Sequence, residues 1–153
     1  MIKDSGTRRK FASGAVRDIQ EGKGRCDLLP LEVVAMMYGK PVFTALWRFQ
    51  QTGNHGYLLD AIREFCRERN WDVNTMLLEV SIHFEEGAKK YGENNWQKGI
   101  PPNCYLDSAI RHYLKWRRGD KDEPHDRAFI WNLMCCIYEV RGGRENVQAK
   151  SKL

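Results

Sequence analysis

Acidic and histidine side chains occur in three separate groups between residues 83 and 132, and each group lies in a segment with helical spacing. In chain order these side chains are Glu85 and Glu86, then Asp107 and His112, then Asp122, Glu123, His125 and Asp126. Carboxylates contributed by several helices are the oxygen ligands that Mg²⁺ and Mn²⁺ prefer. Lysines and arginines lie between the groups, and they suit phosphate. The pattern predicts metal-assisted nucleotide chemistry.

The last helical segment, from Pro124 to about Val140, is apolar on most faces. His125 and Asn132 lie seven residues apart on one of its faces, so we expect both to be buried. A buried polar group without a partner costs roughly 1–3 kcal/mol. The pair therefore requires a metal, a ligand or each other, and both residues are candidate catalytic residues.

Each acidic group also has a simpler interpretation. Glu85 and Glu86 precede Lys89 and Lys90 by about one helical turn, which is typical of a solvated helix face. Asp107 lies four residues before Arg111 and outside the apolar stripe of its helix, which is typical of a surface ion pair. Both alternatives stay open at this point.

The periodicity of apolar residues predicts an all-α bundle of about five or six helices. The expected helices follow Pro30 and end at Gly39, and then cover 42–51, 57–69, 74–91, 103–118 and 124–140, with Asn74 or Thr75 and Asn103 as expected caps. Strand and hairpin signals are nearly absent. We expect residues 1–28 to form an extended arm, residues 29–140 the domain, and residues 141–153 a basic flexible tail.

Size and composition fit one soluble domain. The chain has 153 residues, 42% of them hydrophobic, and a formal net charge of +5. The five cysteines are odd in number and form no CxxC motif, so we expect reduced thiols. Neither a signal peptide nor an 18-residue apolar run is present, which predicts a cytoplasmic protein without a membrane partner. The chain also lacks a GxSxG motif, a Walker P-loop and a GxGxxG motif.

The N-terminal arm combines glycines with basic residues, namely Gly14, Arg17, Gly22, Lys23, Gly24 and Arg25. It is either a flexible basic arm or, if ordered, a clamp in which backbone amides and guanidinium groups hold a triphosphate. In the second case Asp18 and Asp27 would contact ribose or base.

Four segments together carry a resemblance to a known family: SGAVRDIQEGKGRCDLLP, HFEEGAKKYGENNWQKGIP, YLDSAIRHYLKWRRGD and DEPHDRAFIWNLMC. They resemble the phage dATP/dGTP diphosphohydrolases of the MazZ type, which are similar to the wider MazG-like all-α pyrophosphohydrolases. The resemblance covers about 19 N-terminal residues and roughly residues 77–139. The helices at about 35–76 are unmatched and read as an insertion.

The resemblance implies cleavage of a purine deoxynucleoside triphosphate to monophosphate and pyrophosphate with Mg²⁺ or Mn²⁺, in a homo-oligomer from a phage. On this basis the expected metal ligands are Glu85, Glu86, Asp107, Glu123 and Asp126. The expected phosphate and substrate ligands are Arg17, Asp18, Lys23, Arg25, Lys89, Lys90 and Arg111. His125 would orient water or bind metal, and Asn132 would hold a ligand in place. The family's ExxD motif fits Glu123 and Asp126, whereas a shifted register would use Asp122 and His125.

Two alternatives remain. Arg111-His112 followed by His125-Asp126 superficially resembles the ligands of HD-type phosphohydrolases, which would release other products. A non-catalytic basic protein that binds nucleic acid or a partner is the third hypothesis, and nucleic acid is the less expected ligand because the excess positive charge is modest.

Overall fold

The computed structural model describes residues 5–39 and 41–142. In these ranges the chain forms six α-helices, one two-stranded sheet and two single-turn 3₁₀ helices. Their bounds are β1 Arg8–Lys10, β2 Val16–Asp18, η1 Cys26–Leu28, α1 Leu31–Tyr38, α2 Pro41–Thr52, α3 Gly56–Arg69, α4 Val73–Tyr91, η2 Asn95–Gln97, α5 Pro102–Arg118 and α6 His125–Val140. The predicted all-α class is confirmed.

Two of the expected helix caps were wrong. Helix α4 is capped by Asp72, whose Oδ1 accepts a hydrogen bond of 2.9 Å from the backbone N–H of Thr75. This carboxylate satisfies an N–H group that has no partner inside the helix, as expected at an N-cap. Asn103 does not cap α5 either, because the helix already begins at Pro102.

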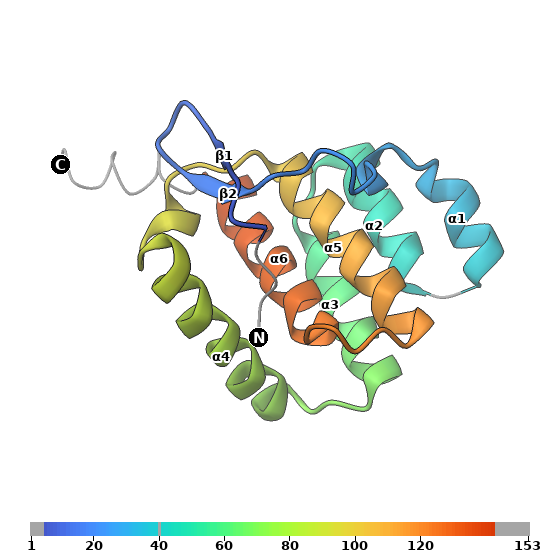
Figure 1. The fold of residues 1–153 in the computed structure, drawn as a ribbon. Coiled ribbons are helices and arrows are strands. Elements are labelled where there is room, and N and C mark those ends of the chain that lie inside the picture. The colour runs from blue at the N-terminus through green and yellow to red at the C-terminus, as the bar shows by residue number, and fades with distance from the viewer. Residues whose placement is uncertain (1–4, 40, 143–153) are drawn as a thin grey trace, which may run out of the picture.

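Helices α5 and α6 pack side by side at the centre of the molecule. Helices α2 and α3 lie on one side of this pair and α1 lies beyond α2, whereas α4 lies on the other side (Figure 1). The ring of Phe65 on α3 joins the two parts of the core, with its centroid 4.7 Å from Phe129 of α6 and 4.9 Å from Trp116 of α5. This aromatic packing holds α5 and α6 from behind and leaves their other side available for a site.

The N-terminal arm is more ordered than the sequence suggested, since β1 and β2 form an antiparallel hairpin. Its strands have only three residues each, which is too short for a visible alternation of apolar and polar residues. Gly14 adopts a positive φ of 91° in the connecting turn, where Phe11 N–H donates to the Ala15 carbonyl. In its described part, residues 5–28, the expected extended arm therefore contains a short hairpin that the sequence did not predict.

Asn95 of η2 fixes this hairpin to the helices. Its side chain accepts a hydrogen bond of 2.8 Å from Val16 N–H and donates one of 2.8 Å to the Val16 carbonyl. Asn95 is buried, and Ala15 beside Val16 is fully buried. A single amide thus satisfies both backbone groups of a residue in β2.

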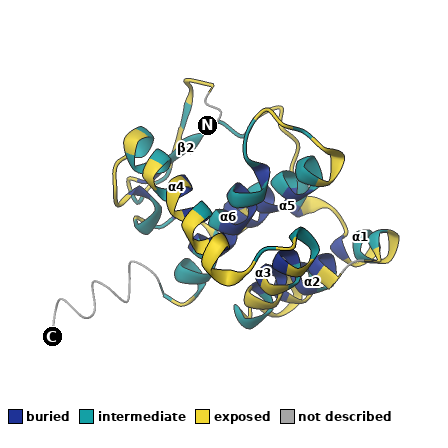
Figure 2. Cartoon of the chain, turned by 90° about the horizontal axis from the view of Figure 1, so that it is seen from below, coloured by how far each residue is buried: buried dark blue, intermediate teal, exposed yellow. Residues whose placement is uncertain are grey.

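Apolar side chains remain exposed on the two outermost helices. Figure 2 shows that buried residues concentrate on α5 and α6, whereas α1 and the outer side of α4 are largely exposed. The exposed apolar side chains of α4 are Val73, Leu77, Leu78 and Ile82. Helix α4 turns Met76, Val80 and His83 inward instead, so these four side chains face away from the core.

Further sequence expectations concern the cysteines, the membrane and the tail. All five cysteines are free and four of them are buried, so the expected absence of a disulfide framework is confirmed. Among the described helices none has the length and apolar character needed to cross a bilayer. The predicted basic tail lies, apart from residues 141 and 142, outside the described residues.

The two hydrogen bonds of Asn95 generate a prediction. Asn95→Ala leaves the N–H and carbonyl of Val16 without partners, so the free energy of unfolding should fall by about 1–3 kcal/mol. Amide exchange at Val16 should accelerate by more than exchange in the core helices. Urea unfolding and hydrogen exchange measure both effects. The exposed neighbour Asn94→Ala is the matched control, and equal effects of the two substitutions would contradict this role of Asn95.

Candidate functional site

A cavity of about 490 Å³ lies between the N-terminal hairpin, α4 with η2, and the central pair α5 and α6. The hairpin segment forms one wall from Val16 to Gln20, and α4 forms the opposite wall from His83 to Tyr91. Helices α5 and α6 contribute side chains between Cys104 and Asn132. The cavity is large enough for a small organic molecule.

One part of the cavity wall is strongly basic. Helix α5 contributes Arg111 and Lys115, one turn apart, and the arm contributes Arg9 and Lys23. Lys23 Nζ lies 3.0 Å from Asp18, and Arg111 Nη2 lies 2.6 Å from Asp107. Lys115, in contrast, has no carboxylate partner among the described residues. This part of the wall can therefore attract an anionic ligand.

Arg17 is the arm residue held most firmly by the helices. Its Nη2 donates to Ser108 Oγ at 2.9 Å and to Asn132 Oδ1 at 3.1 Å, and both partners are neutral. The guanidinium carbon also lies over the rings of Tyr105 and Trp131, at 5.2 and 6.0 Å from their centroids. Its Nη1 is buried and has no hydrogen-bond partner in the described part of the chain. A guanidinium in this environment favours an anionic ligand.

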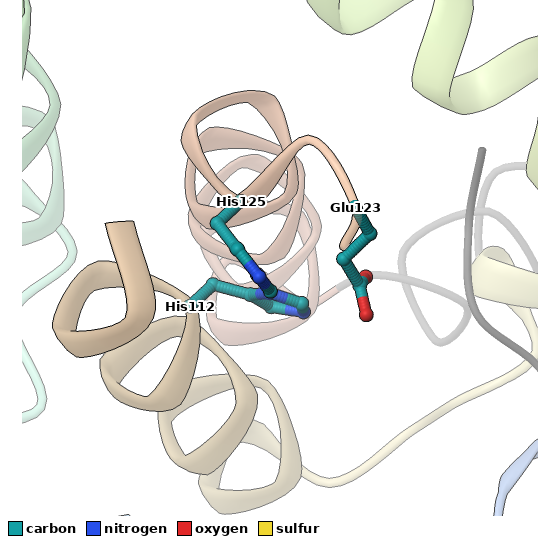
Figure 3. Close-up of side chains that lie close together, drawn as sticks. All are labelled: His112, Glu123 and His125. Atoms are coloured by element: carbon teal, nitrogen blue, oxygen red, sulfur yellow. The ribbon is translucent and has the colours of Figure 1, made fainter. Parts of the chain in front are cut away.

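Two histidines and a glutamate meet where α5, α6 and their connection come together. His112 comes from α5, Glu123 from the connection and His125 from the first residue of α6 (Figure 3). One ligand atom from each of the three lies within 4.8 Å of the other two. His112 and Glu123 also line the cavity. Asp120 and Asp122 form a second such group with the same His125.

The geometry of the histidines fits a divalent metal. The Nδ1 atoms of His112 and His125 are 2.9 Å apart, close to the roughly 3 Å that separates two nitrogen ligands at a right angle on one ion. On its other side, His125 Nε2 lies 2.7 Å from Asp122 Oδ1. A proton placed there leaves the Nδ1 lone pair free, and a carboxylate commonly orients a metal-binding histidine in this way. Burial, and then the proximity of His125, lower the pKa of His112 well below its ordinary value, so His112 is neutral at pH 7.

The α4 side of the cavity is aromatic and small. His83, Phe84, Gly87, Ala88 and Tyr91 of α4 face the cavity, together with Trp96 of η2 and Trp131 of α6. His83 is 6% exposed, and its ring centroid lies 5.4 Å from that of Trp131. Burial, reinforced by Arg127, lowers the pKa of His83 to about 4, so this imidazole is neutral at pH 7. The cavity thus has a basic part and an uncharged aromatic part.

Only one of the five predicted metal ligands belongs to a group with metal-binding spacing within the described residues, and it is Glu123. Glu86 Oε1 accepts from Arg127 at 2.9 Å, and Asp126 Oδ2 accepts from Arg69 at 3.1 Å. Buried Asp107 accepts from Arg111 and, at 2.6 Å, from Cys26 N–H, so it also anchors the arm. Glu85 is exposed on α4. The structure thus places Glu86, Asp107 and Asp126 in three separate ion pairs.

The predicted catalytic residues are both buried, as their positions on α6 suggested. His125 pairs with His112 and Asp122, while Asn132 binds Arg17 and donates to the Ala128 carbonyl at 2.9 Å. Of the predicted substrate ligands, four line the cavity: Arg17, Asp18, Lys23 and Arg111. Arg25, which is itself exposed, instead pairs with the buried Asp27 at 2.7 Å. Lys89 and Lys90 are not part of the cavity wall.

Sequence reasoning did not assign His83, Lys115 or Trp131 to the site. Lys115 lies four residues after Arg111, a spacing that places both on one face of α5 and was a usable signal. His83 precedes Phe84 in the apolar stripe of α4 and carried no separate signal. Trp131 required knowledge of which face of α6 meets the cavity.

The lowered pKa of His83 predicts a dependence of stability on pH. The unfolded chain binds a proton at His83 below about pH 6.5. The folded chain binds it only near pH 4. The free energy of unfolding should therefore fall as pH drops from 6.5 to 4, with His83 contributing about 3 kcal/mol. His83→Phe should flatten this fall in urea titrations at pH 7.5 and 4.5, and an unchanged slope would contradict a neutral buried His83.

The comparisons with known proteins point to one family. The family model described as dATP/dGTP diphosphohydrolase, N-terminal, matches residues 73–148, about half of the chain. No curated protein and no solved structure gave a match. The matched region includes α4, α5 and α6, which supply the aromatic wall, the basic residues Arg111 and Lys115 and the histidine–glutamate group. The chain therefore belongs, through residues 73–148, to the family of dATP/dGTP diphosphohydrolases.

Proposed function

We propose that the protein hydrolyses purine deoxynucleoside triphosphates to monophosphate and pyrophosphate with the help of a divalent metal, in the cavity beside α4 and α5. The family name supports the reaction. The observation that carries the proposal for this chain is the position of His112 and Glu123 in the same cavity wall as Arg111 and Lys115. A candidate metal group and phosphate-binding side chains thus adjoin one cavity.

The metal would be held by His112, Glu123 and His125, with Asp122 orienting His125. A divalent ion bound there would polarise a phosphate oxygen and lower the pKa of a bound water. Of the two ions that the resemblance implies, Mn²⁺ suits this group better, because imidazole is a poor ligand for Mg²⁺ and Mg²⁺ favours oxygen. The arrangement supports neither predicted register in full, because it takes Glu123 from one and His125 from the other, with Asp122 orienting His125 and Asp126 paired with Arg69.

The chain's own cations would bind the triphosphate. Arg111 and Lys115 lie on the same helix as His112, and Arg17 and Lys23 approach from the arm. In the reaction, water oxygen forms a bond to the α-phosphorus and loses a proton. The bond from that phosphorus to the α,β-bridging oxygen breaks, and pyrophosphate leaves with the electron pair. These cations offset the charge that develops on the phosphate oxygens.

Three of the other predicted carboxylates could bind a metal only if they first gave up their present partners. Metal binding at Glu86, Asp107 or Asp126 would have to displace Arg127, Arg111 or Arg69 respectively. Breaking such an ion pair costs free energy. Within the described residues, metal binding at His112, Glu123 and His125 requires no ion pair with an arginine to be broken. We therefore assign these three residues to positioning and treat Glu85, which is exposed, as a matched control.

An HD-type phosphohydrolase is the second candidate, and the contact between His112 and His125 favours it. The ion pair of Asp126 with Arg69 opposes it, since an HD motif uses the aspartate that follows the histidine. Products separate the two reactions: pyrophosphate supports the first, while inorganic phosphate or intact triphosphate supports the second. Salt-dependent binding to DNA, without release of any product from triphosphates, would support the non-catalytic alternative.

The metal assignment makes a prediction about three substitutions. Glu123→Gln should weaken Mn²⁺ binding at least tenfold, since even residues that only orient ligands typically account for about 10–100-fold. Glu85→Gln should leave it unchanged, and Asp126→Asn should mainly lower stability. Isothermal titration with Mn²⁺ measures binding, and pyrophosphate release from dATP and dGTP measures turnover.

Two results would contradict the assignment. Unchanged Mn²⁺ binding in Glu123→Gln would exclude the histidine–glutamate group. A loss of binding and turnover in Asp126→Asn, with an unchanged melting temperature, would instead favour the Glu123 and Asp126 register.

We also propose that the protein self-associates through the outer face of α4, formed by Val73, Leu77, Leu78 and Ile82. These four apolar side chains are between 40% and 70% exposed and form two neighbouring rows, Val73 with Leu77 and Leu78 with Ile82. An exposed apolar stripe of this kind is typical of a contact between subunits. The proposal also places the protein in the cytoplasm, where its substrates occur, and retains the phage origin implied by the resemblance.

Self-association makes a prediction about molecular mass. In light scattering after gel filtration, the wild type should have a multiple of the 17.9 kDa chain mass. Leu78→Glu should shift the mass toward one chain, because a buried charge in the contact is costly. Met37→Glu, on the exposed side of α1, is the control. A monomeric wild type would end the proposal, and dissociation by Met37→Glu alone would assign the contact to α1.

A further inference from the structure

We propose that the α4 side of the cavity, built by His83, Gly87 and Trp131, binds the nucleobase and determines which base is accepted. This inference rests on the proposed function, and it assigns an orientation to the substrate. The base would lie against α4, and the triphosphate would extend toward Arg111 and Lys115 of α5.

The spacing of residues on α4 creates a flat, open wall. His83, Gly87 and Tyr91 are four residues apart, so they form one row along the helix, with Phe84 and Ala88 in the row beside it. All five face the cavity. A Cβ added at Gly87 would meet no atom within 4 Å, so the missing side chain leaves real space there. A glycine inside a helix costs about 1 kcal/mol relative to alanine, and the space it leaves offers a reason for its presence.

Two buried nitrogens, each on a residue that lines this side of the cavity, have no hydrogen-bond partner among the described residues. They are Nδ1 of His83 and Nε1 of Trp131. The indole N–H only donates, whereas a neutral imidazole nitrogen donates or accepts. Leaving such groups unpaired is unfavourable, so a ligand that pairs with both gains affinity. The edge of a nucleobase offers ring nitrogens and exocyclic groups suited to both, and its faces suit the surrounding aromatic rings.

Arg17 marks the boundary between the two parts of the cavity. Its guanidinium lies over the rings of Tyr105 and Trp131, while its buried Nη1 has no partner among the described residues. No carboxylate lines the wall between His83 and Tyr91, whereas the basic residues Arg111 and Lys115 line the α5 wall. Charge thus favours phosphate near α5 and an uncharged ring near α4, which fixes the direction of the bound nucleotide.

The test separates the base from the phosphates by using two kinds of probe. The ratio kcat/KM is measured for dATP, dGTP, dCTP and dTTP, and inhibition is measured with inorganic tripolyphosphate, which has no base. The variants are Gly87→Ala, Gly87→Leu and His83→Phe. Ser81→Ala, exposed on the same helix, is the control. Melting temperatures show whether each variant folds, and alanine at position 87 should stabilise the helix.

The subsite predicts a specific pattern. Gly87→Leu should lower kcat/KM for the preferred base at least about tenfold, and Gly87→Ala should lower it less. His83→Phe should reduce the ratio between the best and worst base about tenfold, since one lost hydrogen bond carries that much discrimination. Inhibition by tripolyphosphate should stay within about twofold in all variants, because its ligands lie on α5 and the arm.

Two outcomes overturn the inference and a third concerns the proposed function instead. If folded His83→Phe and Gly87→Leu kept the same ratios of kcat/KM among the four nucleotides, the base would bind elsewhere. Equal losses of nucleotide turnover and tripolyphosphate inhibition would show that α4 faces the phosphates. A wild type that releases no pyrophosphate from any of the four nucleotides would refute the reaction itself.

Discussion

The candidate site depends on one half-buried cation, Arg17, whose hydrogen-bond partners are neutral. Arg17 reaches from the N-terminal arm to Ser108 and Asn132, two side chains that carry no charge. Moving a guanidinium out of water is costly, and the hydroxyl, the amide and two aromatic rings offset only part of that cost. The positive charge of Arg17 is therefore not neutralised by its partners. Because Arg17 lines the cavity, this charge favours an anionic ligand there.

Polar contacts of this kind hold the arm against the helices, together with the packing of Ala15 and Phe11 on the core. Asn95 binds both backbone groups of Val16, and Asp107 accepts the N–H of Cys26. Arg111 Nη2 further donates to the Gly24 carbonyl at 2.6 Å. Buried hydrogen bonds are directional, so they define the position of a short segment that has little apolar surface of its own. The aromatic core around Phe65 holds α5 and α6 together, and the arm takes no part in these ring contacts.

The sequence predicted the helices well because each has a regular apolar period and a clear end. Gly119 ends α5 in a left-handed conformation, and the burial of His125 and Asn132 followed from their position on an apolar helix. The hairpin was missed because three-residue strands carry almost no pattern. The candidate site was predicted only in part. Helical spacing places Asp126 near His125 along the chain, yet their side chains turn to different partners, Arg69 and Asp122.

Which residues form an ion pair depends on the tertiary structure, so the spacing of residues along one helix does not predict it. Asp107 and Arg111 were one turn apart in the sequence, and the structure keeps them paired, but inside the protein rather than on its surface. Glu86 and Arg127 are distant in sequence and adjacent in space. A carboxylate-rich sequence pattern therefore predicts that acidic side chains are present, but not whether each of them binds a metal or forms an ion pair.

The family match begins at residue 73, whereas Arg17 and Lys23 lie in the N-terminal arm, well before the matched region. The two walls of the cavity thus belong to different parts of the chain, joined through Asn95 and Asn132. Substitutions in the arm can therefore change the contacts to a ligand while the histidine–glutamate group, which lies wholly in the matched region, keeps its side chains.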